Sequence, residues 1–357
     1  MKIAQSKSQP HLQGVISPLR IGFIPVADCA PLLVARELDL FRLHGVQVEF
    51  SCEVGWATIR EKLLHGQVDA AHAVSGLAFA LSLGLDCQPF PVVAPFIFNL
   101  HGNAITLSTD LWNRGVRDVA TLKKLIKSTH RRFTFAVVSA YSTHNFLLRE
   151  WLSAGGINPE TDLRIVSLPP TQMAPSLKSG LVDGFCVGEP WNSEAVNSGY
   201  GWVAATSADL APLHPEKALL IGSAFAKAHS SQIAAVISAL TQACAWCDKM
   251  ENRPAVARIL HESSYFRCKE DVLMRSLAGP FVTGTGREIP ADQFHIFHRH
   301  NANESTPAKG AWIMHQLLRH QVIPGDREPE ALALLPQIWA SPMPTILKTP
   351  KLKHALT

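Results

Sequence analysis

The twenty residues from Gln172 to Trp191, QMAPSLKSGLVDGFCVGEPW, decide how the rest of the chain is interpreted. They predict the end of a helix, a stop at Gly180, and a short buried strand from Val182 to Val187, since this run is almost entirely apolar. The strand leads into Gly188-Glu189-Pro190-Trp191, where the proline prevents further ladder pairing. An acidic residue and a large aromatic residue therefore follow the carboxyl end of a strand, which is the edge where open α/β sheets bind ligands.

The same pattern occurs once earlier in the chain. The segment from Leu64 to Ala71 matches the segment from Lys178 to Phe185 in its glycine, valine and aspartate positions, and an amphipathic helix precedes each segment. The two aspartates are Asp69 and Asp183, 114 residues apart. One such unit in each half predicts two similar α/β lobes that face each other. The alternative is a coincidental match of a common helix-to-strand turn.

Composition narrows the class of protein. A chain of 357 residues with 47% hydrophobic and 17% charged residues predicts about two domains with a large core. The net charge of +4 comes without a dense Lys/Arg run, so no direct nucleic-acid binding is expected. The N-terminus lacks the apolar segment of a secretory leader, and no stretch approaches the ~18 apolar residues of a membrane span. Seven scattered cysteines are typical of a reducing compartment. These features favour a cytoplasmic protein without membrane insertion.

Two strand-to-helix junctions in the first part of the chain attract attention. A strand from Leu19 to Val26 precedes a helix from about Pro31 to Phe41, and Asp28 is a plausible N-cap for that helix. Trp56 falls where a second strand ends and the next helix begins, which places it on the carboxyl edge of the sheet.

Two polar segments later in the chain leave alternatives open. Residues Ser139 to His144 form a small polar loop before a helix, with Ser142 or Thr143 as the N-cap. His144 then lies in the first turn, which is either part of an anion site or simply exposed to solvent. The polar break from Asn99 to Asn103 is equally consistent with a turn and with amides that face a ligand.

No catalytic or metal-binding motif is evident. Cys244 and Cys247 form a CxxC pair inside an apolar helical run, which favours a buried helix face over a redox or metal site. His295, His298 and His300 lack a carboxylate or cysteine at ligand spacing, so a polar face is preferred to a metal site. We therefore expect no enzyme activity, no metal and no cofactor.

At this point the sequence resembles a known family, the nitrate- and bicarbonate-binding receptors of ABC importers (NrtA/CmpA-like). The resemblance covers roughly Leu19 to Asp248 well and the remainder loosely. It rests on the following segments: Gly55-Trp56-Ala57-Thr58, Gly102-Asn103-Ala104-Ile105, Thr143-His144, Leu152 to Pro159, Pro169 to Met173, Phe185-Cys186-Val187-Gly188-Glu189-Pro190-Trp191-Asn192, and His214-Pro215-Glu216-Lys217-Ala218.

The resemblance implies a two-lobed α/β fold of the type II periplasmic-binding-protein class, with a ligand cleft between the lobes. We expect residues 19–107 together with 221–341 to form the first lobe and residues 108–220 to form the second. Residues 1–18 would be an N-terminal extension, and residues 342–357 a loose tail.

The family's pocket residues carry over to six positions of this chain. They imply a tryptophan wall, a neighbouring backbone donor, an amide, a histidine at a helix start, a proline, and a lysine that pairs with the anion. The matching residues are Trp56, Thr58, Asn103, His144, Pro170 and Lys217. The importers carry glutamine where this chain has Asn103, which is one methylene shorter. A small planar anion needs several donors and one paired cation to leave water.

Three functions are compatible with this resemblance. The absence of a leader favours the branch of cytoplasmic nitrate/nitrite sensors of the NasS type. These hold an ANTAR-type RNA-binding antiterminator (NasT-like) inactive until nitrate or nitrite binds. The alternative is a solute-binding receptor of a nitrate ABC importer. An enzyme on the same fold, such as a thiamine-pyrimidine synthase, is disfavoured because the cysteines are dispersed rather than clustered.

Overall fold

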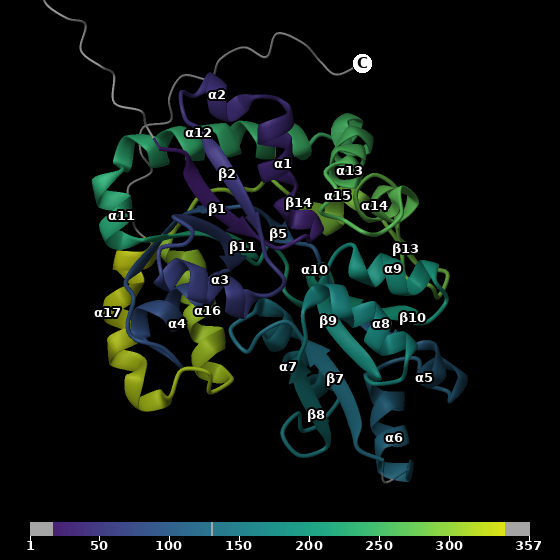
Figure 1. The fold of residues 1–357 in the computed structure, drawn as a ribbon. Coiled ribbons are helices and arrows are strands. Elements are labelled where there is room, and N and C mark those ends of the chain that lie inside the picture. Colours follow the sequence, from purple (N-terminus) through teal and green to yellow (C-terminus); the bar gives the residue numbers. More distant parts are fainter. Residues whose placement is uncertain (1–16, 130, 340–357) are drawn as a thin grey trace, which may run out of the picture.

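The computed structural model describes residues 17–129 and 131–339, which form two α/β lobes (Figure 1). Each lobe is built on a five-stranded sheet, with strand orders β2-β1-β3-β11-β4 and β10-β6-β9-β7-β8. The N-terminal extension predicted for residues 1–18 lies outside the described residues except for Ser17 and Pro18. The tail predicted for residues 342–357 lies wholly outside them.

The first lobe carries the N-terminal strands and most of the C-terminal helices. Its strands are β1 (Leu19–Phe23), β2 (Val48–Cys52), β3 (Ala70–Val74), β4 (Val92–Ile97) and β11 (Lys217–Gly222). Its helices are η1 (Ala27–Cys29), α1 (Ala30–Glu37), α2 (Leu40–Leu43), α3 (Trp56–Leu64), α4 (Leu77–Leu83), α11 (Ser223–Ala228), α12 (Ser230–Cys247), η3 (Met250–Asn252), α13 (Arg253–Glu262), α14 (Glu270–Leu277), α16 (Pro307–Arg319), η4 (Gly325–Arg327) and α17 (Glu328–Trp339).

The second lobe repeats the same plan with fewer helices. Its strands are β6 (Asn103–Ser108), β7 (Phe133–Val137), β8 (Leu163–Ser167), β9 (Gly184–Gly188) and β10 (Gly201–Thr206). Its helices are α5 (Thr109–Asn113), α6 (Val119–Thr129), α7 (Thr143–Ala154), η2 (Pro170–Gln172), α8 (Met173–Lys178), α9 (Trp191–Asn197) and α10 (Ser207–Leu210). Two short ladders and one short helix complete the described chain: β5 (Leu100–His101) with β14 (His295–Ile296), β12 (Phe281–Val282) with β13 (Glu288–Ile289), and α15 (Ala291–Phe294).

The pairing of the strands shows where the chain changes sheets. Strand β6 pairs antiparallel with β9 in the second sheet, and β11 pairs antiparallel with β3 in the first. The boundary expected at residues 107/108 therefore falls at the end of β6, and the one expected at 220/221 falls inside β11. Because a strand belongs to the sheet with which it hydrogen-bonds, we propose crossings near residues 102 and 216 instead.

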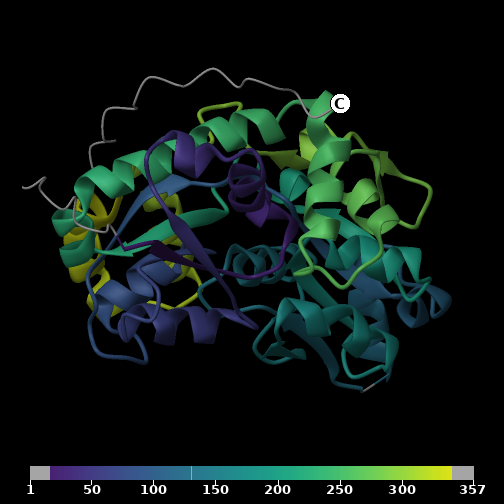
Figure 2. The same cartoon turned by 45° about the horizontal axis from the view of Figure 1, so that its top comes forward.

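Helices cover both faces of the first sheet. One face packs under α1, α12 and α13 through residues such as Ile21 and Phe23, and the opposite face packs on α3, α4, α16 and α17. Figure 1 shows the green helix α12 and the yellow helix α17 on opposite sides of this lobe, and Figure 2 gives the view with α12 turned forward. The apolar core under α3, α4, α16 and α17 continues into the second lobe through Phe146 and Phe185. The lobes are thus joined by packed apolar side chains as well as by the crossing strands.

The repeated motif forms the same structure in each lobe. Gly66 and Gly180 adopt positive φ angles of 61° and 72°, which a residue with a side chain rarely adopts. Asp69 then pairs with Arg20 at 2.7 Å, and Asp183 pairs with Arg131 at 2.6 Å. The match between the two segments therefore marks a structural repeat rather than a coincidence.

Candidate functional site

A buried lysine lies where the chain returns to the first lobe. Lys217 is the first residue of β11, and only 1% of it is exposed. Its Nζ lies 2.6 Å from Glu216 Oε1 and 2.9 Å from Asp28 Oδ2. Burial by itself lowers the pKa of the ammonium, but Asp28 and Glu216 outweigh burial and raise the pKa. Lys217 is therefore a charged, fully enclosed cation held by two carboxylates.

Asp28 follows β1 at the same edge of the first lobe's sheet as Lys217, because β1 runs parallel to β3 and β11 runs antiparallel to it. It was expected to cap helix α1, but it lies inside the 3-10 turn η1, and helix α1 begins two residues later with Cys29 at its N-cap position and no side-chain cap. Its side chain instead approaches Lys217, and His72 Nε2 lies 3.1 Å from its Oδ1. Burial favours the protonated acid, yet Lys217 and His72 overcome this effect and hold the pKa below its usual range. The capping prediction was wrong because a buried cation 189 residues away binds the carboxylate.

The second lobe contributes the N-terminus of helix α7. Ser142 caps this helix, and its side chain accepts a hydrogen bond from the Asn145 amide. Of the two residues predicted as the cap, Ser142 or Thr143, the structure therefore has the first. The Thr143 hydroxyl donates to Glu216 Oε2, and His144 Nε2 lies 3.7 Å from Glu216 Oε1. His144 is only 1% exposed, which rules out the solvent-exposed alternative. Burial is the main cause that lowers the pKa of His144 to about 3.

Asn103 and Trp56 complete this arrangement. The Asn103 amide nitrogen lies 3.4 Å from the Thr143 hydroxyl oxygen, at the start of the crossing strand β6. The Trp56 ring opens helix α3, and Lys217 Nζ lies 5.6 Å from its centroid, within the range of a cation–π contact. The Trp56 indole N–H and both ring nitrogens of His144 have no hydrogen-bond partner among residues 17–129 and 131–339. Buried donors of this kind are usually satisfied, so they mark a place suited to a small polar ligand.

We refer to the residues that meet here as the polar cluster. Each is at most 4% exposed, and the set comprises Asp28, Trp56, His72, Asn103, Thr143, His144, His214, Glu216 and Lys217. Four of the six predicted pocket residues belong to it: Trp56, Asn103, His144 and Lys217. Thr58 is half-buried in the first turn of α3, and Pro170 is buried at the start of η2. No hydrogen bond or ion pair of the described residues links Thr58 or Pro170 to the cluster, and their part in a pocket stays a prediction.

Sequence reasoning missed the acidic half of the cluster. Glu216 stands next to Lys217 in the quoted HPEKA segment, and His72 interrupts the otherwise apolar strand β3. A single histidine in an otherwise apolar, buried strand could have indicated a buried polar site at this position. The polar break near residue 100 contains a turn, since the Asn99 amide donates to the His101 carbonyl. Asn103 lies in the cluster, and an amide of this break that faces a ligand stays a prediction.

Glu189, the acidic residue that follows strand β9, does not contact Lys217 but has other hydrogen-bond partners. Glu189 accepts hydrogen bonds from the Ser193 amide and the Ser276 hydroxyl, and its backbone oxygen accepts from the Ala27 amide at 2.6 Å. Burial raises the pKa of this carboxyl. The peptide bond that follows it, to Pro190, is cis. The carboxyl end of β9 thus ties the two lobes together beside the cluster rather than facing Lys217.

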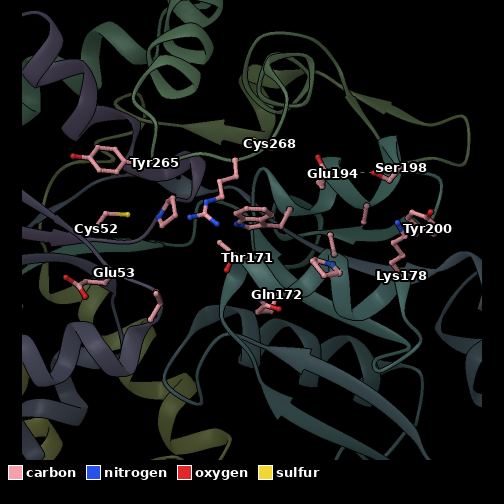
Figure 3. Close-up of a pocket in the computed structure, with 17 residues that line it drawn as sticks. Cys52, Glu53, Thr171, Gln172, Lys178, Glu194, Ser198, Tyr200, Tyr265 and Cys268 are labelled. Atoms are coloured by element: carbon pink, nitrogen blue, oxygen red, sulfur yellow. Dashed lines mark hydrogen bonds between the residues drawn. The ribbon is translucent and has the colours of Figure 1, made fainter.

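A groove of about 650 Å³ lies between the lobes (Figure 3). Cys52 and Glu53 line it from the first lobe, and Thr171, Gln172 and Trp191 line it from the second. The residues of the polar cluster do not line this groove, because they are enclosed. The groove is therefore separate from the polar cluster, and its lining residue Thr171 directly follows Pro170 in the sequence.

The remaining candidate sites are the histidine and cysteine motifs. The described part of the chain holds no group of three His, Cys, Asp or Glu side chains placed to bind a metal. His295 is buried whereas His298 and His300 are exposed, so these three do not converge. Cys244 and Cys247 are buried thiols on α12, and burial raises the pKa of each. None of the described helices has the length and apolar character needed to cross a membrane.

Comparison with known proteins places this geometry in context. A model of the NMT1-like family matches residues 16–261. The chain is 30% identical over 336 residues to the nitrate/nitrite binding protein NrtA of Synechococcus elongatus, and the match covers 90% of this chain and 75% of that protein. It is 35% identical over 305 residues to the nitrate import ATP-binding protein NrtC of Synechocystis, and the match covers 84% of this chain. The chain spans about half, 46%, of that longer protein.

A solved structure supports the architecture. The periplasmic nitrate-binding protein NrtA of Synechocystis PCC 6803 superposes with a TM-score of 0.85 at 27% identity, over 91% of this chain and 86% of that one. The predicted fold, two α/β lobes of the type II periplasmic-binding-protein class, is confirmed. The similarity is to binding proteins, in agreement with the expectation that the chain is not an enzyme.

Proposed function

The chain belongs to the NMT1-like family, within the NrtA/CmpA-like group of nitrate- and bicarbonate-binding proteins, and we propose that it binds nitrate or nitrite between its lobes. One observation carries this proposal. A tryptophan, an amide, a helix-start histidine and a lysine from separate elements of both lobes meet in one buried cluster. We further propose that the chain acts as a solute-binding receptor of a nitrate ABC importer. Its relative NrtA is named a nitrate/nitrite binding protein, and its relative NrtC a nitrate import ATP-binding protein.

The chemistry of the cluster suits a small planar anion. Lys217 supplies a full positive charge, and charge-assisted hydrogen bonds contribute roughly 1.5–3 kcal/mol each. Trp56, Asn103 and His144 add N–H donors, and the first turn of α7 adds the positive end of a helix dipole. Lys217 is expected to pair with the anion, and its ammonium already lies against the carboxylates of Asp28 and Glu216. Anion binding therefore depends on the neighbouring donors as much as on the lysine.

Calorimetry with nitrate, nitrite, bicarbonate and sulfate tests this function. We expect Lys217→Ala to weaken nitrate binding by about 2–5 kcal/mol, or roughly thirty-fold or more, because the only cation of the cluster is removed. Lys217→Glu should abolish binding. The matched control is Lys227→Ala, an exposed lysine on α11. A folded Lys217→Ala protein whose nitrate affinity stays within about threefold of wild type, well under a tenfold change, would place the site elsewhere.

A second candidate is the cytoplasmic sensor role predicted from the sequence. In it, nitrate or nitrite binding releases an ANTAR-type antiterminator that acts on transcripts of nitrate assimilation. The seven cysteines are all unpaired thiols, a pattern typical of a reducing compartment, and this observation supports the candidate. The names of the relatives support the importer role more directly.

Affinity purification from the native cell separates the two roles. The sensor role requires the protein in the soluble cytoplasmic fraction, bound to an RNA-binding protein that nitrate displaces. The importer role requires nitrate-dependent association with membrane transporter subunits. Recovery with those subunits and no nitrate-displaced RNA-binding protein would remove the sensor role.

A further inference from the structure

The carboxylate of Glu216 lies at the centre of the polar cluster and already engages its donors. The Thr143 hydroxyl donates to Oε2, Lys217 Nζ lies 2.6 Å from Oε1, and ring nitrogens of His144 and His214 lie 3.7 Å away. A carboxylate is planar with two oxygens on one atom, as nitrite is. Glu216 therefore competes, as an internal anion, for the donors that a bound oxyanion would use.

The charge balance makes this competition costly for a second anion. The cluster holds one cation, Lys217, and two carboxylates, Asp28 and Glu216, each fully buried. Burial keeps the pKa of His144 at about 3 and also lowers the pKa of His214, so these two histidines beside Glu216 add no charge at neutral pH. A nitrate ion would raise the excess of negative charge from one to two in an enclosed site. Buried charge without compensation is strongly unfavourable, and such sites take up protons instead.

We propose that this chain binds its anion together with one proton, and that Glu216 is the residue that makes this proton necessary. The proposal rests on the proposed function. The proton comes from solvent and binds either Glu216 Oε1 or His144 Nε2, which lie 3.7 Å apart. No bond other than the new O–H or N–H bond forms, and no electron is transferred. Either protonation restores the charge that the cluster has before the anion enters.

Groups on every neighbouring element bear on this step. The titratable side chains that face Glu216 and Lys217, directly or through Asp28 and His214, are Asp28 on η1, His72 on β3, His101 on β5, His144 on α7, Cys186 on β9, His214 before β11 and His295 on β14. Arg253 on α13 acts on this set only through His295. Glu216 and His144 are the pair that lies beside the donors of the second lobe, since Glu216 accepts from Thr143 and Thr143 lies against Asn103.

The direction of the pH effect follows from the unbound cluster. Burial favours the protonated acid of Glu216, but Lys217, His144 and His214 overcome burial and lower its pKa to about 2. Burial lowers the pKa of His144 to about 3. Both groups are therefore unprotonated above pH 5 until the anion raises their proton affinity. Nitrate binding should weaken about tenfold for each unit of rising pH, since one proton enters with each anion.

Calorimetry of the full chain with sodium nitrate, in buffers of different ionisation enthalpy, counts the protons. At pH 7 we expect close to one proton taken up per nitrate, and an affinity that falls about a hundred-fold from pH 6 to pH 8. In Glu216→Gln the amide keeps an acceptor for Thr143 but removes one negative charge. We expect its proton uptake to fall close to zero and its nitrate affinity at pH 8 to exceed that of the wild type.

The control and the overturning outcomes are distinct. Glu330→Gln removes an exposed carboxylate paired with Arg327 and should behave as the wild type. Nitrate binding without proton uptake in the wild type, or proton uptake that persists in folded Glu216→Gln, overturns the proposal and leaves the proposed function intact. No nitrate binding at any pH between 5 and 8 overturns both. The wild-type proton count decides the matter even if the variant does not fold.

Discussion

The two lobes share a scaffold but differ in the side chains that they present to each other. In the first lobe, Arg20 at the start of β1 and Asp69 before β3 exchange backbone and side-chain hydrogen bonds. In the second lobe, Asp183 before β9 binds the Thr134 amide and Arg131 in the equivalent way. The strand orders coincide as well, with β1, β2, β3, β11 and β4 matched by β7, β8, β9, β6 and β10.

The carboxyl edges of these matched strands carry different chemistry. After β1 the first lobe places the buried acid Asp28, whereas after β7 the second lobe places Thr143 and His144 at a capped helix start. After β2 comes Trp56, and after β8 comes Pro170. The repeat thus fixes the backbone, and the binding chemistry comes from its asymmetry: the first lobe brings an acid and an indole, and the second brings a hydroxyl and an imidazole at a helix start. Glu216 and Lys217, at a crossing between the lobes, join the two.

Removing the joining cation should give the largest effect on folding. In Lys217→Ala, Asp28 and Glu216 remain buried without their partner, which typically costs about 3–5 kcal/mol of unfolding free energy. The wild type holds the pKa of both carboxyls low, so their stabilisation is complete above their unfolded pKa values and is lost as pH falls through the folded values, about 2 for Glu216. In the variant, burial without the lysine raises the pKa of both carboxyls, so they take up protons at a higher pH. The difference in unfolding free energy between the wild type and the variant should therefore become smaller as pH falls.

Urea unfolding at pH 7 and pH 5 measures this. Lys227→Ala on the exposed surface of α11 is the control and should change little. If Lys217→Ala lost less than about 1 kcal/mol of unfolding free energy at pH 7, Lys217 would not be the charged partner of Asp28 and Glu216. A loss that grows on acidification would contradict this pairing as well.

The matched aspartates should give an intermediate and nearly equal effect, one in each lobe. Asp69→Ala and Asp183→Ala each remove charge-assisted hydrogen bonds to an arginine and to a backbone amide, at about 1–3 kcal/mol. The Asp183 side chain is 7% exposed and that of Asp69 is 12%, so we expect the second-lobe variant to lose slightly more. Asp110→Ala, on an exposed pair with Arg114, is the control.

Denaturation curves for these three variants test whether the repeat is energetic as well as geometric. If one aspartate proved neutral while the other destabilised the protein, the two lobes would share a backbone pattern but not the interaction that holds it.

The scaffold could be predicted from the sequence because its signals are local. The glycine, valine and aspartate of each repeat lie within one helix-to-strand turn, and the Ser142 cap lies within three residues of the amide that it accepts from. The lobe boundaries were harder to place. Strands β6 and β11 are apolar runs that suit either sheet, and only their antiparallel pairing shows to which sheet each belongs.

The candidate site could be predicted only in part, because its contacts are distant in sequence. Resemblance to a family supplied Trp56, Asn103, His144 and Lys217, which the structure brings together. Asp28 and Glu216 were not found, since the partner of Asp28 is 189 residues away and that of Glu216 in helix α7 is 73 residues away. A local pattern made Asp28 look like a helix cap. Tertiary charge pairing overrides such local preferences.

The smallest expected effect concerns a contact between the lobes at the far side of α7. Arg319, at the end of α16 on the first lobe, pairs with Glu150 of α7 at 2.7 Å, and His320 stacks on Phe146 at 5.7 Å. Arg319→Ala should cost only about 0.2–1 kcal/mol of unfolding free energy, because the Arg319 side chain is 57% exposed and solvent screens the pair. His320, whose Nε2 lies 3.9 Å from Glu150 Oε1, and then Arg319 lower the pKa of Glu150. The contribution of Glu150 to stability is therefore present above its unfolded pKa and fades as pH falls below it.

Helix α7 also holds Thr143 and His144, at its opposite end from Glu150. We expect the loss of the Arg319 contact not to reach that end, so calorimetry of Arg319→Ala should show a nitrate affinity within about threefold of wild type, less than a tenfold change. A larger loss of affinity in a folded Arg319→Ala protein would mean that this contact positions α7 for binding, so that the second lobe would depend on the first for its donors.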